Sequence, residues 1–219
     1  MSIPKVIYQT YKNKIPWYTH FYIWRFRRKN KDFGYEFYND AKIDIFIKDN
    51  FPSEVYNAYS RLQIGAAKAD FFRYAILYKK GGVYLDIDSD ILINLNTLIR
   101  PDDKAILTYE KNNKVYAQWA MFYEKEHPFL KETIKLIVHN IQQNKYPHNV
   151  HATTGPSIYT VAIRRVIHKN PDVSFRMTTK NYKGKLRFKY IMARILMNKR
   201  INPEYWKRKQ LTTTVASPE

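Results

Sequence analysis

Apolar and polar residues change their spacing several times along the chain, and the changes predict alternating strands and helices. An apolar run at 4–10 and the segment 34–39 are typical of strands, because they are short and rich in aromatic and β-branched residues. Spacings near 3.6 predict helices between them. The expected helices are 16–29, 41–49 with Asp40 as N-cap, 52–60, 65–79, 128–144, 156–168 and 186–198, and the further expected strands are 83–85, 105–109 and 115–123.

This alternation predicts an α/β fold in which helices cover a central sheet. No internal repeat, low-complexity tract or linker interrupts it, so we expect a single domain over residues 1–219. Ligands of such sheets bind at the carboxyl ends of the strands. Asp86 and Asp88 follow the strand 83–85 directly, so this end of the sheet is the predicted site.

Three carboxylates occur at every second position, Asp86, Asp88 and Asp90. Side chains of an extended segment alternate with a period of two, so these can point the same way. Clustered carboxylates repel one another unless a cation lies between them, and a hard divalent metal that also bridges phosphates is the simplest such cation. Asp90 is the surplus carboxylate, either a solvated turn acid or a further group at the metal.

A calcium-binding loop of the EF-hand type opens with the same three aspartates. That loop requires glycine at its sixth position and a bidentate glutamate at its twelfth. Ile91 and Thr97 occupy these positions here. The sequence therefore excludes this kind of calcium site.

The segment around the aspartates resembles a known family over a longer pattern. A small residue is followed by Asp70, Arg73, Leu77-Tyr78, Gly81-Gly82, Tyr84, Asp86 and Asp88, in that order and spacing. This resembles the DxD sugar-binding region of glycosyltransferase family 32, including its bacterial capsular and lipopolysaccharide-type members. The resemblance implies a GT-A type fold, a nucleotide-sugar donor (UDP-sugars favoured), Mn²⁺ or Mg²⁺, and hexose transfer with retention.

The resemblance also implies roles for individual residues. Asp88 would bind the metal, and Asp86 would face the hydroxyls of the ribose and the sugar, both as catalytic groups. Asp70 and Arg73 would hold the donor, although residues three apart on a helix also form ordinary ion pairs. Tyr84 would line the donor cleft or pack in the core.

Segments outside the aspartate region extend the likeness. Residues 3–11 resemble the family's first strand, so Tyr8, Gln9 and Thr10 are expected near the nucleotide, with Tyr8 in place of the family's histidine. Gln118 is the candidate for a catalytic polar group beside the anomeric carbon, or else a strand-surface glutamine. Trp206 is expected to close over the donor, although the family's His-containing closing segment is missing.

Two more segments of the second half match short family motifs. His127-Pro128-Phe129-Leu130 resembles a helix start, which gives His127 a structural role. Thr154-Gly155-Pro156 also precedes a helix, whose N-terminal amides would face an anion or simply begin the helix.

The net charge of +19 is unusual for a chain of 219 residues. Residues 176–209 alone carry 12 Lys and Arg against one acid, and a stripe of Phe188, Ile191, Met192 and Ile195 predicts a basic amphipathic segment there. Such a helix docks on an anionic membrane or packs on the protein's own core. The partners expected are a nucleotide-sugar donor, a glycan or undecaprenyl-linked oligosaccharide acceptor of bacterial surface polysaccharide synthesis, and an anionic membrane surface, without nucleic acid.

Two alternatives explain part of the same sequence. A nucleic-acid-binding or -processing protein would account for the charge, and an inactive membrane scaffold would keep the fold without turnover. The absence of cysteine permits a reducing compartment, and the N-terminal residues lack the apolar core of a signal peptide. We therefore expect a cytoplasmic protein that is peripheral at the inner face of the cell membrane.

Overall fold

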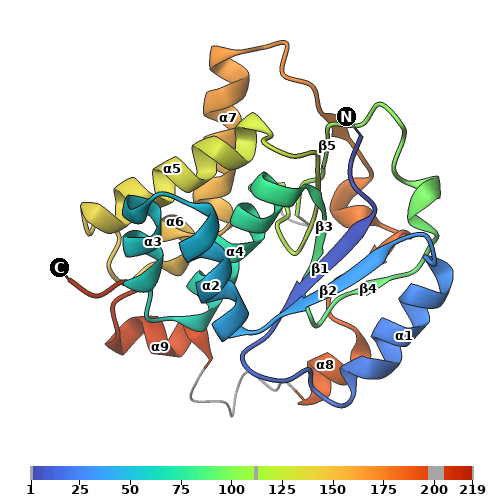
Figure 1. The fold of residues 1–219 in the computed structure, drawn as a ribbon, viewed down its shortest axis with the longest axis horizontal. Coiled ribbons are helices and arrows are strands. Elements are labelled where there is room, and N and C mark those ends of the chain that lie inside the picture. Colours follow the sequence, from blue (N-terminus) through green and yellow to red (C-terminus); the bar gives the residue numbers. More distant parts are fainter. Residues whose placement is uncertain (1, 111–112, 197–204, 219) are drawn as a thin grey trace.

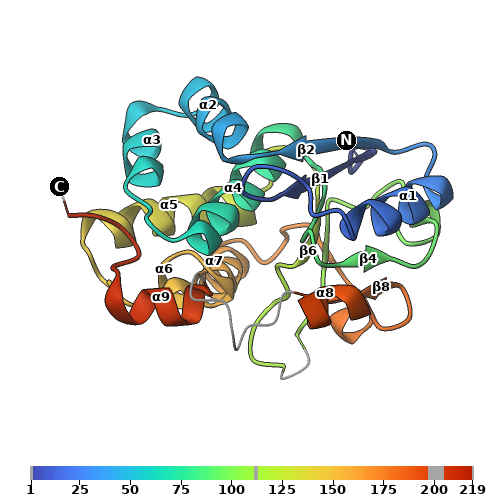
Figure 2. The ribbon, with the colours of Figure 1, turned by 90° about the horizontal axis from the view of Figure 1, so that it is seen from below.

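The computed structural model describes residues 2–110, 113–196 and 205–218. A six-stranded mixed sheet in the order β2-β1-β3-β6-β5-β7 forms its centre, and β4 and β8 form a second, two-stranded sheet. Figures 1 and 2 show α2 to α7 and α9 on one side of the large sheet, with α1, α8 and the small sheet on the other. The strands are β1 (Val6–Thr10), β2 (Gly34–Tyr38), β3 (Gly82–Leu85), β4 (Asp90–Ile91), β5 (Ala105–Leu107), β6 (Ala120–Tyr123), β7 (Arg176–Met177) and β8 (Leu186–Arg187).

The helices agree in most places with the apolar spacing of the sequence. Two 3₁₀ turns, Leu95–Thr97 between β4 and β5 and Lys180–Tyr182 between β7 and β8, occur in addition to the α-helices of the described residues. The α-helices are α1 (Thr19–Lys29), α2 (Asp40–Asn50), α3 (Ser53–Ser60), α4 (Gly65–Lys80), α5 (Pro128–Gln142), α6 (Val150–Thr153), α7 (Pro156–Lys169), α8 (Ile191–Leu196) and α9 (Trp206–Thr212).

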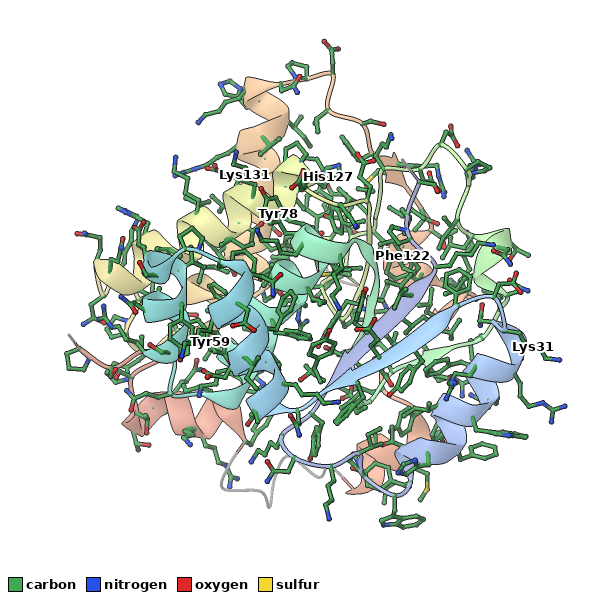
Figure 3. The ribbon with its side chains drawn as sticks, in the orientation of Figure 1. Lys31, Tyr59, Tyr78, Phe122, His127 and Lys131 are labelled. Atoms are coloured by element: carbon green, nitrogen blue, oxygen red, sulfur yellow. The ribbon has the colours of Figure 1, made fainter. Side chains whose placement is uncertain are left out.

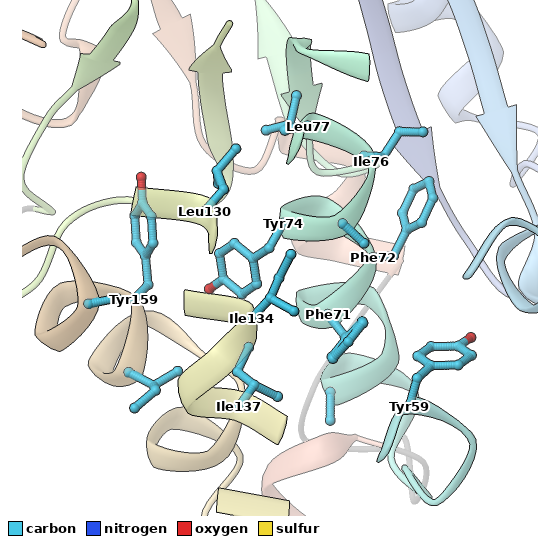
Figure 4. Close-up of a cluster of buried hydrophobic side chains, with 14 of the residues drawn as sticks. Tyr59, Phe71, Phe72, Tyr74, Ile76, Leu77, Leu130, Ile134, Ile137 and Tyr159 are labelled. Carbon is cyan, nitrogen blue, oxygen red and sulfur yellow. The ribbon is translucent and has the colours of Figure 1, made fainter. Parts of the chain in front are cut away.

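The sheet separates two apolar cores because its side chains alternate between the two faces. On β3, Tyr84 packs into the core with α2 to α5 and α7, whereas Val83 and Leu85 pack into the core with α1. Figure 4 shows the first core, where side chains of α4 such as Phe71 and Tyr74 meet Ile134 of α5 and Tyr159 of α7. Phe122 of β6 belongs to the second core (Figure 3).

Strands β1, β2 and β3 are parallel, so their carboxyl ends lie at one edge of the sheet. The short turn at Gly81 and Gly82, between α4 and β3, places β3 beside β1 in this orientation. Gly82 has φ of +102°, and a Cβ there would lie 2.8 Å from the carbonyl oxygen of Val6, so β3 enters the sheet closely beside β1. Helix α4 therefore runs antiparallel to β3, and its first half lies near the end of β3, where the predicted site begins.

Several element boundaries differ from the sequence prediction. Asn39, rather than Asp40, is the N-cap of α2, because its side chain accepts a hydrogen bond from the Lys42 amide. Helix α1 begins only at Thr19. The predicted strands 105–109 and 115–123 are shorter, because Tyr109 and Tyr116 form only an isolated bridge.

The predicted helix over 186–198 is confirmed only in part, because α8 covers Ile191–Leu196 and the residues before it are not helical. Leu186 and Arg187 form β8 and pair with β4, and Lys189 has φ of +55°, which ends regular structure before α8. Phe188 packs against Trp119, with ring centroids 5.3 Å apart, so this part of the basic segment covers the protein's own second core. Residues 197 and 198 of the predicted helix lie outside the described residues.

Candidate active site

Arg73 is the centre of the polar cluster at the carboxyl edge of the sheet. Its guanidinium lies 3.2 Å from Asp70 Oδ1 and 3.0 Å from Asp86 Oδ1, so one cation joins α4 to the turn after β3. It also donates to the Gln118 carbonyl oxygen at 2.9 Å and lies over the Tyr84 ring at 4.7 Å. Since only 5% of Arg73 is exposed, these groups replace its hydration.

Both carboxylate oxygens of Asp70 also accept hydrogen bonds from neutral donors. Gln118 Nε2 donates to Oδ1 at 2.9 Å, and Thr154 Oγ1, just before α7, donates to Oδ2 at 3.2 Å. Burial raises the pKa of Asp70 to about 7, although Arg73 opposes this shift by favouring the carboxylate.

Asp86 is held through both its backbone and its side chain. Its amide donates to the Trp119 carbonyl oxygen at 2.7 Å, and its own carbonyl accepts from Gln9 Nε2 at 3.2 Å. Tyr84 donates its hydroxyl to Asp86 Oδ1 at 3.2 Å. Burial raises the pKa of Asp86 to about 6, and Arg73 counteracts part of this rise.

Asp88 lies two residues on, in the turn that leads to β4. Its Oδ2 is 3.8 Å from Lys189 Nζ, and its carbonyl oxygen accepts a 3.0 Å hydrogen bond from the Tyr190 amide. The segment after β8 therefore lies against this turn. The side chains of Asp86 and Asp88 are 25% and 16% exposed, compared with 7% for Asp70, so these two carboxylates are the more accessible to solvent.

Asp90 does not join the other two aspartates, which corrects both interpretations of it. Strand β3 ends at Leu85, and the turn at 86–89 ends the alternation on which the prediction depended. Asp90 is completely buried on β4 and forms an ion pair with Arg25 of α1. It is neither a solvated acid nor a neighbour of Asp88 at a shared metal.

The residues fit a divalent metal that substrate oxygens help to bind. Among the described residues, no group of three His, Cys, Asp or Glu is arranged to hold a metal ion. Mg²⁺ and similar ions are commonly bound by one or two carboxylates together with substrate phosphates and water. Asp88 offers such a carboxylate next to Asp86, so the donor set suits a metal completed by a diphosphate.

The structure brings together most of the predicted site residues. Asp70, Arg73, Tyr84, Asp86 and Gln118 form one network, in which Gln118 uses its amide for Asp70 and for the Tyr74 hydroxyl. In this arrangement Gln118 orients Asp70, which is a different task from contacting the anomeric carbon.

Three of the predicted site residues, Tyr8, Gln9 and Thr10, lie on β1. Gln9 is fully buried and orients Asp86, whereas Thr10 donates to the Tyr38 carbonyl oxygen at 2.9 Å. Tyr8 is only 2% exposed and lies in the first core, so its ring offers no face for stacking on a nucleotide base. The expectation that Tyr8 lies at the nucleotide is thus corrected to a core role.

Trp206 begins α9 and is half-buried. Its ring stacks on His151, with centroids 5.1 Å apart at 26°, and no contact among the described residues joins it to Asp86 or Asp88. Its closing over the donor stays a prediction.

Several supporting residues were missed or only half-assigned from sequence. Tyr74 and Lys189 carry no motif, and only the fold brings them to the site. Thr154 lies in the Thr-Gly-Pro motif, yet its hydroxyl contact with Asp70 depends on the packing of α7 against α4. His127 is the N-cap of α5, since its Nδ1 accepts from the Phe129 amide, and this confirms its structural role (Figure 3).

A separate groove of about 560 Å³ lies between the edge strand β2 and helix α2. Tyr38, Phe46 and Lys80 are among its lining residues, whereas Asp86 and Asp88 are not. The aspartate cluster is therefore distinct from this groove.

Comparison with known proteins places the cluster in a family context. Residues 16–106 match the family model described as "Glycosyltransferase sugar-binding region containing DXD motif". The chain is 28% identical over 194 residues to the initiation-specific alpha-1,6-mannosyltransferase of Schizosaccharomyces pombe, covering 74% of this chain and 48% of that protein. It is 30% identical over 156 residues to an uncharacterized glycosyltransferase of Acanthamoeba polyphaga mimivirus (70% and 60%), and 28% identical over 173 residues to inositol phosphoceramide mannosyltransferase 3 of S. pombe (73% and 44%).

Solved structures share the fold. The PaToxG glycosyltransferase superposes with a TM-score of 0.62 at 17% identity, covering 100% of this chain and 82% of that chain. The ligand-free glycosyltransferase domain of the YGT toxin gives 0.57 at 9% identity, covering 81% and 80%. The fold is thus the GT-A type, and residues 16–106 are similar to a glycosyltransferase sugar-binding region. It spans 44% to 60% of the length of the curated relatives named above.

Proposed function

We propose that the domain transfers a hexose from a nucleotide-sugar donor to a glycan or lipid-linked oligosaccharide, with retention and with Mn²⁺ or Mg²⁺ bound. The observation that carries this proposal is the network in which Arg73 joins Asp70 and Asp86 beside Asp88. Two carboxylates paired with one buried guanidinium contribute little as a stability device, because desolvation offsets much of their attraction. Such a cluster is typical of a functional site.

Each residue has a defined task in this proposal. Asp88 would hold the metal, and the metal would stabilise the negative charge that develops on the departing diphosphate. Asp86 and Asp70 present carboxylate oxygens to sugar hydroxyls, and Arg73 fixes both carboxylates. Lys189, beside Asp88, supplies a second cation at the position proposed for the diphosphate.

The donor and the acceptor are proposed by class. The resemblance of the sequence favours a UDP-hexose, whereas the named relatives include mannosyltransferases, which adds a nucleotide-activated mannose. The proposed setting is bacterial surface polysaccharide synthesis at the inner face of the membrane. A lipid-linked acceptor is common to this setting and to the relative named for inositol phosphoceramide.

A donor-binding panel tests this proposal. The thermal midpoint is measured with UDP-Glc, UDP-Gal, UDP-GlcNAc, UDP-GalNAc or GDP-Man, each with Mn²⁺ or EDTA. We expect one donor to raise the midpoint only with the metal, and Asp88→Asn to abolish that rise. The exposed Asp102→Asn is the matched control and should keep it. Absence of any metal-dependent rise, together with salt-sensitive DNA binding, would contradict the proposal.

A further inference from the structure

Helix α1 has two apolar faces, only one of which packs on the protein. Ile23 and Phe26 are buried in the second core, and Thr19 is buried on the same helix. On the opposite side, Trp17 in the preceding turn is 75% exposed, Phe21 is 57% exposed and Trp24 is 54% exposed. Positions 17, 21 and 24 are spaced by four and three residues, so they form one stripe. A stripe of large exposed aromatic side chains is unusual on a free surface.

The stripe lies within a strongly basic region. The first acidic residue of the whole chain is Asp32, and the residues before it include eight Lys and Arg. Arg28 continues the stripe and lies over the Trp24 ring at 5.0 Å. The exposed cations of this region are Lys5, Lys12, Lys14, Arg27, Arg28, Lys29 and Lys31.

Helix α8 adds apolar residues next to α1. Tyr190, immediately before α8, stacks on Tyr22 with ring centroids 3.7 Å apart, and its hydroxyl lies 2.8 Å from the Thr19 hydroxyl. Ile191 and Ile195 of α8 are 63% and 61% exposed. Both views show α8 beside the first half of α1 (Figures 1 and 2).

We infer that this aromatic surface, defined as Trp17, Phe21, Trp24, Ile191 and Ile195, docks the domain on an anionic lipid surface. Tryptophan and phenylalanine above a basic helix face suit the boundary between headgroups and acyl chains. The neighbouring Lys and Arg suit anionic headgroups, each with a favourable contribution near the surface. A second copy of the chain would bring two positive surfaces together, which disfavours self-association.

Docking there would bring the reaction to the membrane. Tyr190 contacts α1 through its side chain and the carbonyl oxygen of Asp88 through its amide. Tyr190 therefore connects the aromatic surface to the turn that carries Asp88, the proposed metal ligand. This inference rests on the proposed function only for its purpose, which is to confine the enzyme to the plane of a lipid-linked acceptor.

Vesicle flotation without donor tests the inference. We expect the protein to float with vesicles of phosphatidylcholine and phosphatidylglycerol (7:3) and not with phosphatidylcholine alone. The triple variant Trp17→Ser, Phe21→Ser, Trp24→Ser should lower the partition coefficient at least tenfold while keeping the wild-type thermal midpoint, since these side chains are exposed. The matched control Ile45→Ser, Leu211→Ser removes apolar side chains that are 60% and 74% exposed elsewhere and should stay within twofold of wild type.

Tryptophan quenching provides the second measurement. Brominated acyl chains should quench wild-type fluorescence, and Trp17→Phe with Trp24→Phe should remove most of that quenching. Equal flotation of the triple variant and wild type, or tighter binding of a thymidine oligonucleotide through the same side chains, would overturn the inference. Asp88→Asn should float like wild type, so a failed transferase assay and a failed docking assay remain distinguishable.

Discussion

Removing the Arg73 guanidinium should destabilise the protein more than any surface charge change of the same kind. Arg73→Met keeps much of the side-chain volume but leaves Asp70 and Asp86 without their shared cation. The substitution removes two ion pairs, at 3.2 and 3.0 Å, and the 2.9 Å hydrogen bond to the Gln118 carbonyl oxygen. At pH 8 both carboxyls are ionised in the wild-type protein, because the pH lies above their pKa values of about 7 and about 6.

The expected magnitude follows from burial. Breaking a buried ion pair by removing one partner costs roughly 3–5 kcal/mol, because the remaining charge is uncompensated. Arg73 and Asp70 are each only 5% exposed, so this range applies to Arg73→Met. The matched control is Arg165→Met, because Arg165 lies 3.7 Å from Glu132 and its side chain is 54% exposed. Exposed pairs of that kind contribute about 0–1 kcal/mol.

Urea unfolding at pH 8 measures both variants. The double variant Asp70→Asn, Arg73→Met should recover part of the stability, since one buried charge is then absent. If Arg73→Met does not fold, Arg73→Lys is measured instead. Its stability should lie between those of wild type and Arg73→Met, because an ammonium cannot reach both carboxylates with a planar fork. A destabilisation below about 1 kcal/mol for Arg73→Met, no larger than for the Arg165→Met control, would refute the reasoning.

Three further predictions concern pH, the turn before β3 and the start of α5. Between its ordinary pKa of 3.8 and its folded pKa of about 7, Asp70 binds more protons in the folded than in the unfolded state, so its contribution to stability falls as pH rises. Asp70→Asn should therefore flatten the decline of the thermal midpoint from pH 4 to 7. An unchanged slope would contradict this. Gly82→Ala should lower soluble yield or cost roughly 1–3 kcal/mol in urea unfolding, because φ is +102° and the new Cβ would meet the Val6 carbonyl oxygen. In the control Gly65→Ala the new Cβ meets no atom within 4 Å, so this variant should be neutral or stabilising. His127→Ala should cost at least about 1 kcal/mol through loss of the N-cap, and His127→Asn should restore a part that a merely packed side chain would not restore.

Much of the fold follows from local sequence signals. Gly81-Gly82 ends α4 and lets β3 approach β1, and the apolar spacing of 65–79 predicts α4 to within a residue at each end. The start of the basic segment was predicted wrongly because Phe188 fits the helical period of Ile191, Met192 and Ile195 but lies outside α8. In the structure Phe188 packs on Trp119 and Ile191 remains exposed, which no periodicity reveals.

Site residues that belong to one sequence motif were predictable, whereas those that only tertiary packing brings together were not. Asp70, Arg73 and Asp86 belong to one sequence pattern, and the structure joins them. Asp90 extends that pattern in sequence, yet the turn after β3 directs it to Arg25 instead. Aromatic residues and cations alternate along α1, but sequence does not tell which face of a helix the core covers, so the aromatic surface was not predicted.

Release of nucleotide from the preferred donor tests the central claim most directly. The purified domain is incubated with the donor that raises its thermal midpoint, with Mn²⁺ or EDTA, and free nucleotide is measured for wild type, Asp88→Asn and Asp102→Asn. The account predicts metal-dependent release by wild type and Asp102→Asn, with a decrease of at least about 100-fold in Asp88→Asn, roughly the size expected for removing a group that stabilises the leaving group. Release that is equal in Asp88→Asn and wild type would contradict a site built on this carboxylate.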